Sequence, residues 1–290
     1  MRLSLVLLLY LLSAAAVAQN AATAYTSTEV APGIYVLVGA DGFGGGNIGL
    51  LAGEDHIAII DDGLVPTAEI LLNYVNKLAG RPVDFVINTH VHGDHAGGNA
   101  HFAANDAVIV AHENVRERLQ ADAEPAGGAG GIPTITFADG VTFHLNGIEA
   151  RVHHLPQAHT DGDAFVVFPA ANVIHTGDVF FNGMYPFIDL DNGGSVDGYI
   201  AAQRRIIELS DSETRIIPGH GDIATKADLE AALAMLLDAR ASVKALVDSD
   251  KTEQEVVAAN PLAAYHDKYD WAFITTEHMT RTLYRDLAGS

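Results

Sequence analysis

The stretch Thr89-His90-Val91-His92-Gly93-Asp94-His95-Ala96-Gly97-Gly98-Asn99 is the densest cluster of metal-binding side chains in the chain, and the fold prediction starts from it. It directly follows Val83–Ile87, a short apolar run bounded by polar residues, which is typical of a buried strand. Open α/β folds place their functional sites at the carboxyl ends of strands. We therefore predict a site in the loop after this strand.

The spacing within this stretch indicates metal binding. His90 and His92 are two residues apart in an extended loop, so both imidazoles can point to one side and share a metal ion. Asp94 and His95 follow where the chain turns into a helix, and they point toward a neighbouring position. A polar loop with chance histidines is the alternative, which the rarity of the spacing and the preceding apolar strand disfavour.

The residues on both sides of the stretch predict strands and helices in both halves of the chain. The predicted strands are Ile34–Val38, Asn47–Ala52, His56–Ile60, Val83–Ile87, Val108–Val110, Val141–Leu145, Ile148–Leu155, Ala164–Phe168, Val173–Ile174 and Arg215–Ile217. The predicted helices are Pro66–Leu78, Glu113–Gln120, Tyr199–Leu209 and Lys226–Val247, and the Gly- and Pro-containing residues 121–133 are predicted to be a flexible connection. This order predicts an α/β fold, a sandwich of two mixed β-sheets with helices on both outer faces.

In its H-x-H-x-D-H pattern, from His90 to His95, the chain resembles the metallo-β-lactamase superfamily. The resemblance implies an αββα sandwich with two metal ions in a groove at the edge of the sheets. It covers most of residues 30–225, because further motifs of the family follow in the expected order.

The resemblance also implies a third histidine for the first metal ion, in a G/A-H-T-x-G-D context. The stretch Ala158–Asp163 fits this context and makes His159 the candidate. His153 and His154 are its competitors, but they lie inside a predicted strand and lack the Thr and Gly that follow His159.

Three more positions are carried over from the family in the same way. Asp178, at the end of Val173-Ile174-His175-Thr176-Gly177-Asp178, matches a bridging aspartate, and His220 matches the last histidine. Asp61, which follows the apolar run ending at Ile60, matches a position that supports a ligand from behind, as metal-binding imidazoles usually need.

The implied cofactor is a pair of zinc ions, because neutral imidazoles and carboxylates without sulfur suit this metal. Iron, manganese and a single-metal site are the alternatives. The implied ligands are His90, His92 and His159 for one ion, Asp94, His95 and His220 for the other, and Asp178 between them.

Two cations close together lower the pKa of a shared water molecule from about 15.7 to roughly 7. The resemblance therefore implies that hydroxide is the nucleophile, with Asp94 as the catalytic side chain that orients it. The expected enzyme is a metal-dependent hydrolase of activated acyl bonds, namely lactams, lactones, esters or thioesters, and its partner is a small-molecule acyl substrate.

The substrate is less well determined. Phe181 stands where one group of lactamases carries a lysine that holds the antibiotic, so we expect weak or promiscuous β-lactamase activity. Glutathione thioesterases use a basic C-terminal region, whereas the last residues here, 275–290, have only Arg281 and Arg285 as Arg or Lys. A dedicated β-lactamase, a quorum-signal lactonase and a zinc-binding protein without catalysis are the alternatives.

Three aromatic residues are candidates for the substrate pocket. Phe43 lies in the glycine-rich loop Asp41–Asn47, and Tyr185 and Phe187 lie in the loop after Asp178. The alternative is that all three are ordinary core or loop aromatics.

The charge balance limits the partners. The chain has 16 Lys and Arg against 37 Asp and Glu, a net charge of −21. A surface this acidic repels phosphate backbones and anionic lipids, so we expect neither nucleic acid nor a membrane surface as a partner. The chain has no cysteine, which excludes disulfides and thiolate zinc sites.

The N-terminus resembles an export signal. Met1-Arg2 is positively charged, Leu3–Leu12 is apolar, and Ala16-Val17-Ala18 fits a cleavage site before Gln19. An uncleaved membrane anchor is the alternative, but the apolar run is shorter than the roughly 20 residues of a membrane-spanning helix. We therefore expect a signal peptide over residues 1–18, a single domain over residues 19–290, and a periplasmic or secreted protein.

Overall fold

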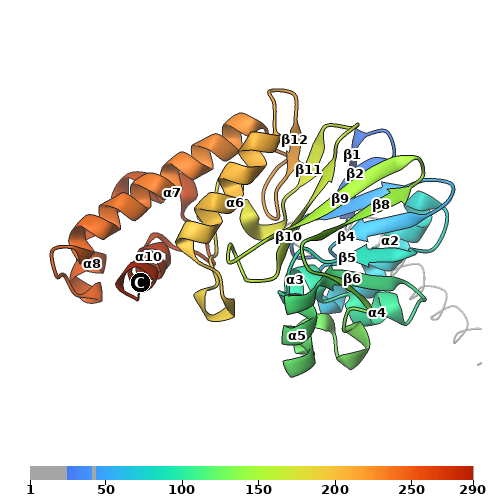
Figure 1. Cartoon of the computed structure of the whole chain (residues 1–290), viewed down its shortest axis with the longest axis horizontal. Coiled ribbons are helices and arrows are strands. Elements are labelled where there is room, and N and C mark those ends of the chain that lie inside the picture. Colours follow the sequence, from blue (N-terminus) through green and yellow to red (C-terminus); the bar gives the residue numbers. More distant parts are fainter. Residues whose placement is uncertain (1–24, 41–43, 290) are drawn as a thin grey trace, which may run out of the picture.

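The computed structural model describes residues 25–40 and 44–289, and it consists of two β-sheets with helices around them (Figure 1). The first sheet has seven strands in sequential order, of which β1 to β4 are antiparallel and β4 to β7 are parallel. Its strands are β1 (Tyr25–Ala31), β2 (Ile34–Gly39), β3 (Ile48–Ala52), β4 (Ile57–Ile60), β5 (Phe85–Ile87), β6 (Val108–His112) and β7 (Ile135–Phe137).

The second sheet has five strands in the order β12-β11-β10-β9-β8. The pair β11 and β12 is parallel and the other pairs are antiparallel, so both sheets are mixed. Its strands are β8 (Gly140–Leu145), β9 (Ile148–Leu155), β10 (Asp163–Phe168), β11 (Val173–His175) and β12 (Arg215–Ile217).

The helices lie outside the two sheets and between the strands in sequence. The α-helices are α2 (Ala68–Ala79), α3 (Gly93–Ala96), α4 (Asn99–Ala103), α5 (Glu113–Ala121), α6 (Val196–Leu209), α7 (Lys226–Val247), α8 (Glu253–Ala259), α9 (His266–Tyr269) and α10 (Thr276–Ala288). Short 3-10 helices are η2 (Val65–Thr67), η3 (Glu124–Ala126), η4 (Ala129–Gly131), η5 (Gly177–Val179), η6 (Leu190–Asn192) and η7 (Ala263–Tyr265). In the described part of the chain, no helix combines the length and the hydropathy needed to cross a membrane.

Side-chain alternation along the strands builds the layers. On β4, Ala58 and Ile60 face the second sheet, whereas Ile57 and Ile59 face α2. On β10, Val166 packs between the sheets. Its neighbour Phe165 faces α6 and α7 on the other side. Because each sheet is covered on both faces, these strands are apolar throughout, as the sequence indicates. The prediction of an αββα sandwich of two mixed sheets is confirmed.

The C-terminal helices form a second apolar cluster beside the sandwich. Figure 1 shows α7 running from α6 and the second sheet toward α8 and α10. Leu236 and Val243 of α7 pack in this cluster with Met279 and Leu283 of α10. The helices α8, α9 and α10 have no counterpart in the sequence predictions, although α10 has a clear apolar face.

The elements that were predicted agree with the structure to within a few residues, and α7 has the predicted bounds, whereas β1, β7 and α4 were not predicted. The predicted flexible connection over residues 121–133 is wrong, because η3 and η4 give this segment regular turns. Asn99 donates a hydrogen bond to the carbonyl of Gly131, 3.0 Å away, and Ala126 is fully buried. The predicted signal peptide lies outside the described residues.

Candidate metal centre

The predicted ligands come from loops at the ends of strands in both sheets. The loop after β5 carries His90 and His92, and α3 follows it with Asp94 and His95. In the second sheet, η5 follows β11 and carries Asp178. The remaining two ligands are His159, in the turn between β9 and β10, and His220, after β12. Ligands up to 130 residues apart thereby meet where the two sheets end.

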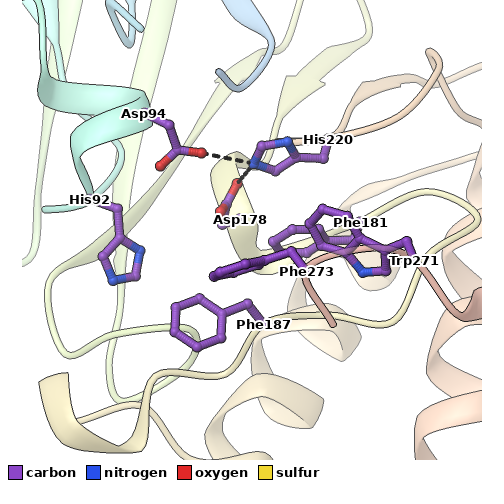
Figure 2. A pocket seen from close by; sticks show the side chains of 8 residues that line it. All are labelled: His92, Asp94, Asp178, Phe181, Phe187, His220, Trp271 and Phe273. Carbon is purple, nitrogen blue, oxygen red and sulfur yellow. Dashed lines mark ion pairs between the residues drawn. The ribbon is translucent and has the colours of Figure 1, made fainter. Parts of the chain in front are cut away.

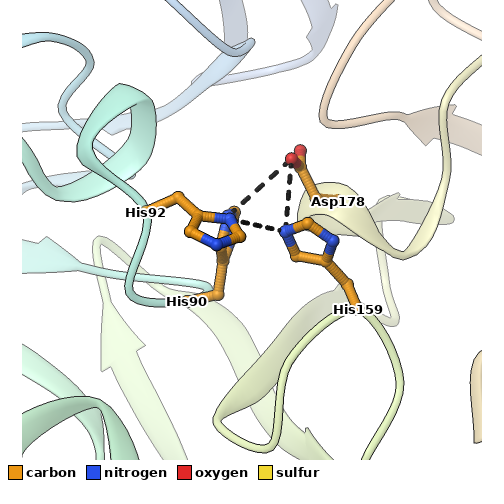
Figure 3. A group of neighbouring side chains, drawn as sticks. All are labelled: His90, His92, His159 and Asp178. Atoms are coloured by element: carbon orange, nitrogen blue, oxygen red, sulfur yellow. Dashed lines mark hydrogen bonds and ion pairs between the residues drawn. The ribbon is translucent and has the colours of Figure 1, made fainter. Parts of the chain in front are cut away.

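The first ligand group consists of His90, His92, His159 and Asp178, whose ligand atoms all lie within 4.8 Å of one another (Figure 3). His159 Nε2 is 2.8 Å from His92 Nδ1. Asp178 Oδ2 is 3.6 Å from His159 Nε2 and 3.7 Å from His90 Nε2. This is the set that the sequence assigns to one metal ion, with Asp178 as the shared residue.

The second ligand group consists of Asp94, His95, Asp178 and His220, again with ligand atoms within 4.8 Å. Asp178 Oδ1 is 3.0 Å from His95 Nε2 and 3.5 Å from His220 Nε2. His220 Nε2 is also 3.3 Å from Asp94 Oδ2. Asp178 thus turns one carboxylate oxygen to each group, which is the geometry of a bridging ligand.

Hydrogen-bond partners hold the other ring nitrogen of His92, His95 and His159. His95 Nδ1 is 2.8 Å from Asp61 Oδ2, which places Asp61 behind a candidate ligand. His159 Nδ1 donates to the carbonyl of Phe187 at 2.7 Å, which leaves Nε2 free to bind. His92 is held at Nε2 by Asp189, 2.8 Å away, and offers Nδ1 to the site. Such partners fix the ring orientation and the tautomer of a metal ligand.

The donor atoms fit metal ions. His90 Nε2 is buried, points into the first group and has no hydrogen-bond partner among the described residues. A buried polar atom without a partner costs free energy unless something else binds it. Imidazole nitrogens and carboxylate oxygens in groups of four, without sulfur, match the ligands that zinc takes in proteins.

Burial and charge set the protonation of the ligands. Burial lowers the pKa of His90, and it lowers the pKa of His159 to about 4, so both imidazoles are neutral at pH 7. Burial opposes ionisation of Asp94, but His95 and His220 outweigh it and hold its pKa at about 2. In the same way, the charge of Asp178 overcomes burial and raises the pKa of His220 to about 9. The carboxylates therefore make a field that favours cations.

Two glycines let other backbone segments approach the ligands. A Cβ on Gly219 would lie 2.0 Å from Asp178 Oδ1, and a Cβ on Gly46 would lie 2.2 Å from His95 Cε1. Both distances are far below van der Waals contact. These positions therefore admit only glycine as long as Asp178 and His95 keep their places.

A cavity of about 400 Å³ opens in front of both ligand groups (Figure 2). Its lining residues are His92, Asp94, Asp178, Phe181, Phe187, His220, Trp271 and Phe273. The predicted catalytic residue Asp94 therefore faces the cavity, with a side chain that is 32% exposed. Phe187 lines it as predicted.

The other two pocket candidates do not line this cavity in the described structure. Tyr185 as a pocket residue is wrong, because its side chain is fully buried among the C-terminal helices and its hydroxyl lies 3.4 Å from the carbonyl of Leu262. Phe43 lies outside the described residues. The sequence also gave no indication of Trp271 and Phe273, which lie about 90 residues from Phe181 and in no motif.

The competing histidines are likewise placed by the structure. His153 and His154 both lie on β9, as predicted, and neither belongs to a ligand group in the described residues. His154 instead stacks on His112, with ring centroids 3.7 Å apart. The sequence did not predict the hydrogen bond between Asp189 and His92, because Asp189 belongs to no motif. Asp189 reaches His92 from the loop before η6.

Comparison with known proteins agrees with this site. The family model described as the metallo-beta-lactamase superfamily matches residues 41–220. Hydroxyacylglutathione hydrolase of Nitrosococcus oceani is 29% identical over 147 residues, which is 50% of this chain and 51% of that protein. Human acyl-coenzyme A thioesterase MBLAC2 is 26% identical over 208 residues, 60% of this chain and 72% of that protein. The matched part thus spans only about half of the bacterial relative.

A solved structure is also similar. The metallo-beta-lactamase from Pontibacter korlensis superimposes with a TM-score of 0.64 at 19% identity, covering 74% of this chain and 99% of that one. At this identity the likeness bears on the fold alone. The matched relatives are hydrolases by name. Since the family model covers well over half of the chain, including all seven candidate ligands, the protein belongs to the metallo-beta-lactamase superfamily.

Proposed function

We propose that this protein is an exported binuclear zinc hydrolase of activated acyl bonds. The observation that carries the proposal is the position of Asp178, whose two carboxylate oxygens face two separate groups of ligands. Each group offers four side chains including Asp178, which is the number that zinc sites commonly use. A single ion would leave one oxygen of Asp178 and the other group of donor atoms without a metal ion.

When bound, zinc ions polarise an acyl carbonyl and lower the pKa of a water molecule. The side chains of the chain position these reactants. Asp94 is ionised at neutral pH and faces the cavity, so its carboxylate can accept a hydrogen bond from the attacking water and orient it. Phe187 and Phe181 border the ligands and exclude bulk water from the reacting bond.

Thioesters are the first substrate class to test. One curated relative named above is an acyl-coenzyme A thioesterase and the other a hydroxyacylglutathione hydrolase, whereas the similarity to the solved lactamase structure concerns the fold alone. Phe181 stacks on His220 with ring centroids 4.9 Å apart, and it offers no charge to an antibiotic carboxylate. We therefore propose weak β-lactamase activity beside the main activity.

Export is proposed from residues 1–18 alone. Expression of the full chain in a bacterium with two membranes should release a mature protein that begins near Gln19 into the periplasm. N-terminal sequencing of the periplasmic protein measures this directly, and an intact Met1 in a membrane fraction would contradict it.

The experiment for the hydrolase is a substrate panel on the mature protein after its zinc content has been measured. A thioester, a lactone, an aryl ester and a cephalosporin are assayed with and without a chelator. We expect hydrolysis that needs zinc and that Asp178→Asn abolishes. A protein that holds two zinc ions and hydrolyses none of the four would instead be a zinc-binding protein without this catalysis.

A further inference from the structure

Aromatic rings connect the two ligand groups along one wall of the cavity. Beside the first group, the ring of Phe187 lies 5.5 Å from that of His92. Phe273 meets Phe187 edge to face at 5.3 Å. Figure 2 shows these two phenylalanines side by side below His92 and Asp178. The wall therefore begins in direct contact with a candidate metal ligand.

The wall continues to the second group. Trp271 lies 5.6 Å from Phe273 and 6.0 Å from Phe181, measured between ring centroids. Phe181 in turn stacks on His220. The four rings of Phe181, Phe187, Trp271 and Phe273, called the aromatic wall below, thus pass without interruption from one ligand group to the other.

Hydrogen bonds fix the segment that contributes Trp271. Its indole Nε1 donates to the carbonyl of Tyr185 at 2.9 Å, and the amide of Tyr185 donates to the carbonyl of Tyr269 at 2.8 Å. Asp270 accepts hydrogen bonds from the amide and the hydroxyl of Thr276, at 2.6 and 3.0 Å. The segment between α9 and α10 is therefore tied to both the loop after η5 and the start of α10.

Half of the aromatic wall lies outside the part of the chain that the family model matches. That match ends at residue 220, whereas Trp271 and Phe273 lie in the C-terminal segment. The ligand loops and the segment that carries Trp271 and Phe273 are thus separate parts of the chain.

The chemistry of the lining selects an uncharged group. Among the described residues that line the cavity, there is no lysine or arginine, and the carboxylates of Asp94 and Asp178 belong to the ligand groups. An anionic group inside the cavity would therefore find no lysine or arginine side chain to pair with. Phe273 is 56% exposed, so a bound apolar group would remove much of its ring from water.

We infer that the aromatic wall binds the acyl part of the substrate and selects compact, uncharged, apolar acyl groups over small or anionic ones. The inference rests on the proposed hydrolase function and adds the substrate class to it. A volume of about 400 Å³ lies at the small end of ligand pockets. The acyl group therefore fits inside, while a larger leaving group extends into solvent past the exposed Phe273.

The test compares three thioesters of N-acetylcysteamine with the zinc-loaded protein. The acyl groups are acetyl, hexanoyl and succinyl, so that chain length and charge vary separately. Each buried methylene contributes about a fourfold preference, and burial of two or more of the four extra methylenes predicts about 15-fold or higher kcat/KM for hexanoyl over acetyl. The succinyl thioester should be hydrolysed no faster than the acetyl one.

Phe273→Ala is the informative variant, because an exposed side chain is removed with little effect on folding. It should reduce the ratio of hexanoyl to acetyl kcat/KM by about fivefold or more, and Phe273→Leu should restore most of it. Leu237→Ala, an exposed apolar side chain on α7 that does not line the cavity, is the matched control and should leave the ratio unchanged.

A binding measurement separates this inference from the proposed function. Trp271 is the only tryptophan of the chain, so intrinsic fluorescence reports on the aromatic wall. The non-hydrolysable thioether S-hexyl-N-acetylcysteamine should change this fluorescence saturably, even in a protein that hydrolyses nothing. Hydrolysis with equal kcat/KM for all three thioesters, or a fluorescence that the thioether leaves unchanged, would overturn the inference while the hydrolase proposal stands.

Discussion

Asp189 offers the sharpest test of the metal centre, because its role depends on one hydrogen bond. Its Oδ1 accepts from the amides of Asp191 and Asn192, both at 3.1 Å. Its Oδ2 accepts from His92 Nε2 at 2.8 Å and from the side-chain amide of Asn192 at 2.7 Å. In Asp189→Asn, the oxygen stays on the backbone amides, and the new NH₂ group then faces two donors.

The consequence for His92 follows from its tautomer. With Asp189, the ring carries its proton on Nε2, and Nδ1 is free to bind a metal ion. Opposite the new NH₂ group at position 189, a donor, the His92 ring favours the tautomer that accepts at Nε2 and carries its proton on Nδ1. A protonated Nδ1 cannot bind a metal ion. Loss of such a support typically weakens metal binding about 10- to 100-fold, which corresponds to roughly 1.4 to 2.8 kcal/mol.

The assay is a zinc titration of the metal-free protein against a chromophoric chelator. The first site should weaken by this factor. The second should stay within about threefold, because the only candidate ligand that the side chain of Asp189 hydrogen-bonds to within the described residues is His92. Asp191→Asn is the matched control, since its side chain in the same turn is 80% exposed and pairs with Arg285. Equal weakening of both sites, or none, would refute the assigned role of Asp189.

Three further predictions concern stability and the ligand positions. Asp61→Ala leaves the buried amide and hydroxyl of Thr89 without their acceptor and should lower the free energy of unfolding by roughly 3 kcal/mol, measured by chemical denaturation. Gly219→Ala should displace Asp178 and reduce bound zinc to below one ion per chain by metal analysis, whereas Gly130→Ala, with its nearest Cβ contact at 3.9 Å, should keep both ions. Chelation should lower the melting temperature by about 8 °C or more, because saturating metal ions at 1,000 times Kd contribute about 4 kcal/mol to the free energy of unfolding. Scanning fluorimetry measures this shift, and an unchanged melting temperature would contradict the prediction.

The ligand cluster from His90 to His95 could be predicted from local spacing, whereas His159, Asp178 and His220 were predicted from the resemblance to the metallo-β-lactamase superfamily. His90 and His92 share a side of one loop, and each of the later ligands follows an apolar strand directly. Strands that end at the same edge bring such residues together without any knowledge of the helices. The same reasoning separates His159, which lies in the loop after β9, from His154, which still lies within β9.

The cavity wall could not be predicted in this way. Tyr185 and Phe187 are two residues apart in the same loop, and nothing in their spacing tells which one faces the ligands. Their orientation is decided by packing against the C-terminal helices, where Tyr185 lies 5.9 Å from Tyr269 between ring centroids. Contacts of this kind depend on the tertiary arrangement of helices, which a single sequence does not specify.

The two parts of the site therefore have different structural origins. The ligands are held by loops that emerge from the two packed sheets, and a change in one of them disturbs buried hydrogen bonds such as those of Asp61. Trp271 and Phe273 are held by the C-terminal helices, and Phe273 is largely exposed. Substitutions at the exposed rim can therefore alter which acyl group is accepted at little cost to the metal centre. Ring contacts at His92, His159 and His220 join the ligands to the aromatic wall. Because Phe273 itself touches none of these histidines in the described residues, substitutions there can change the selectivity while the hydrolytic chemistry stays the same.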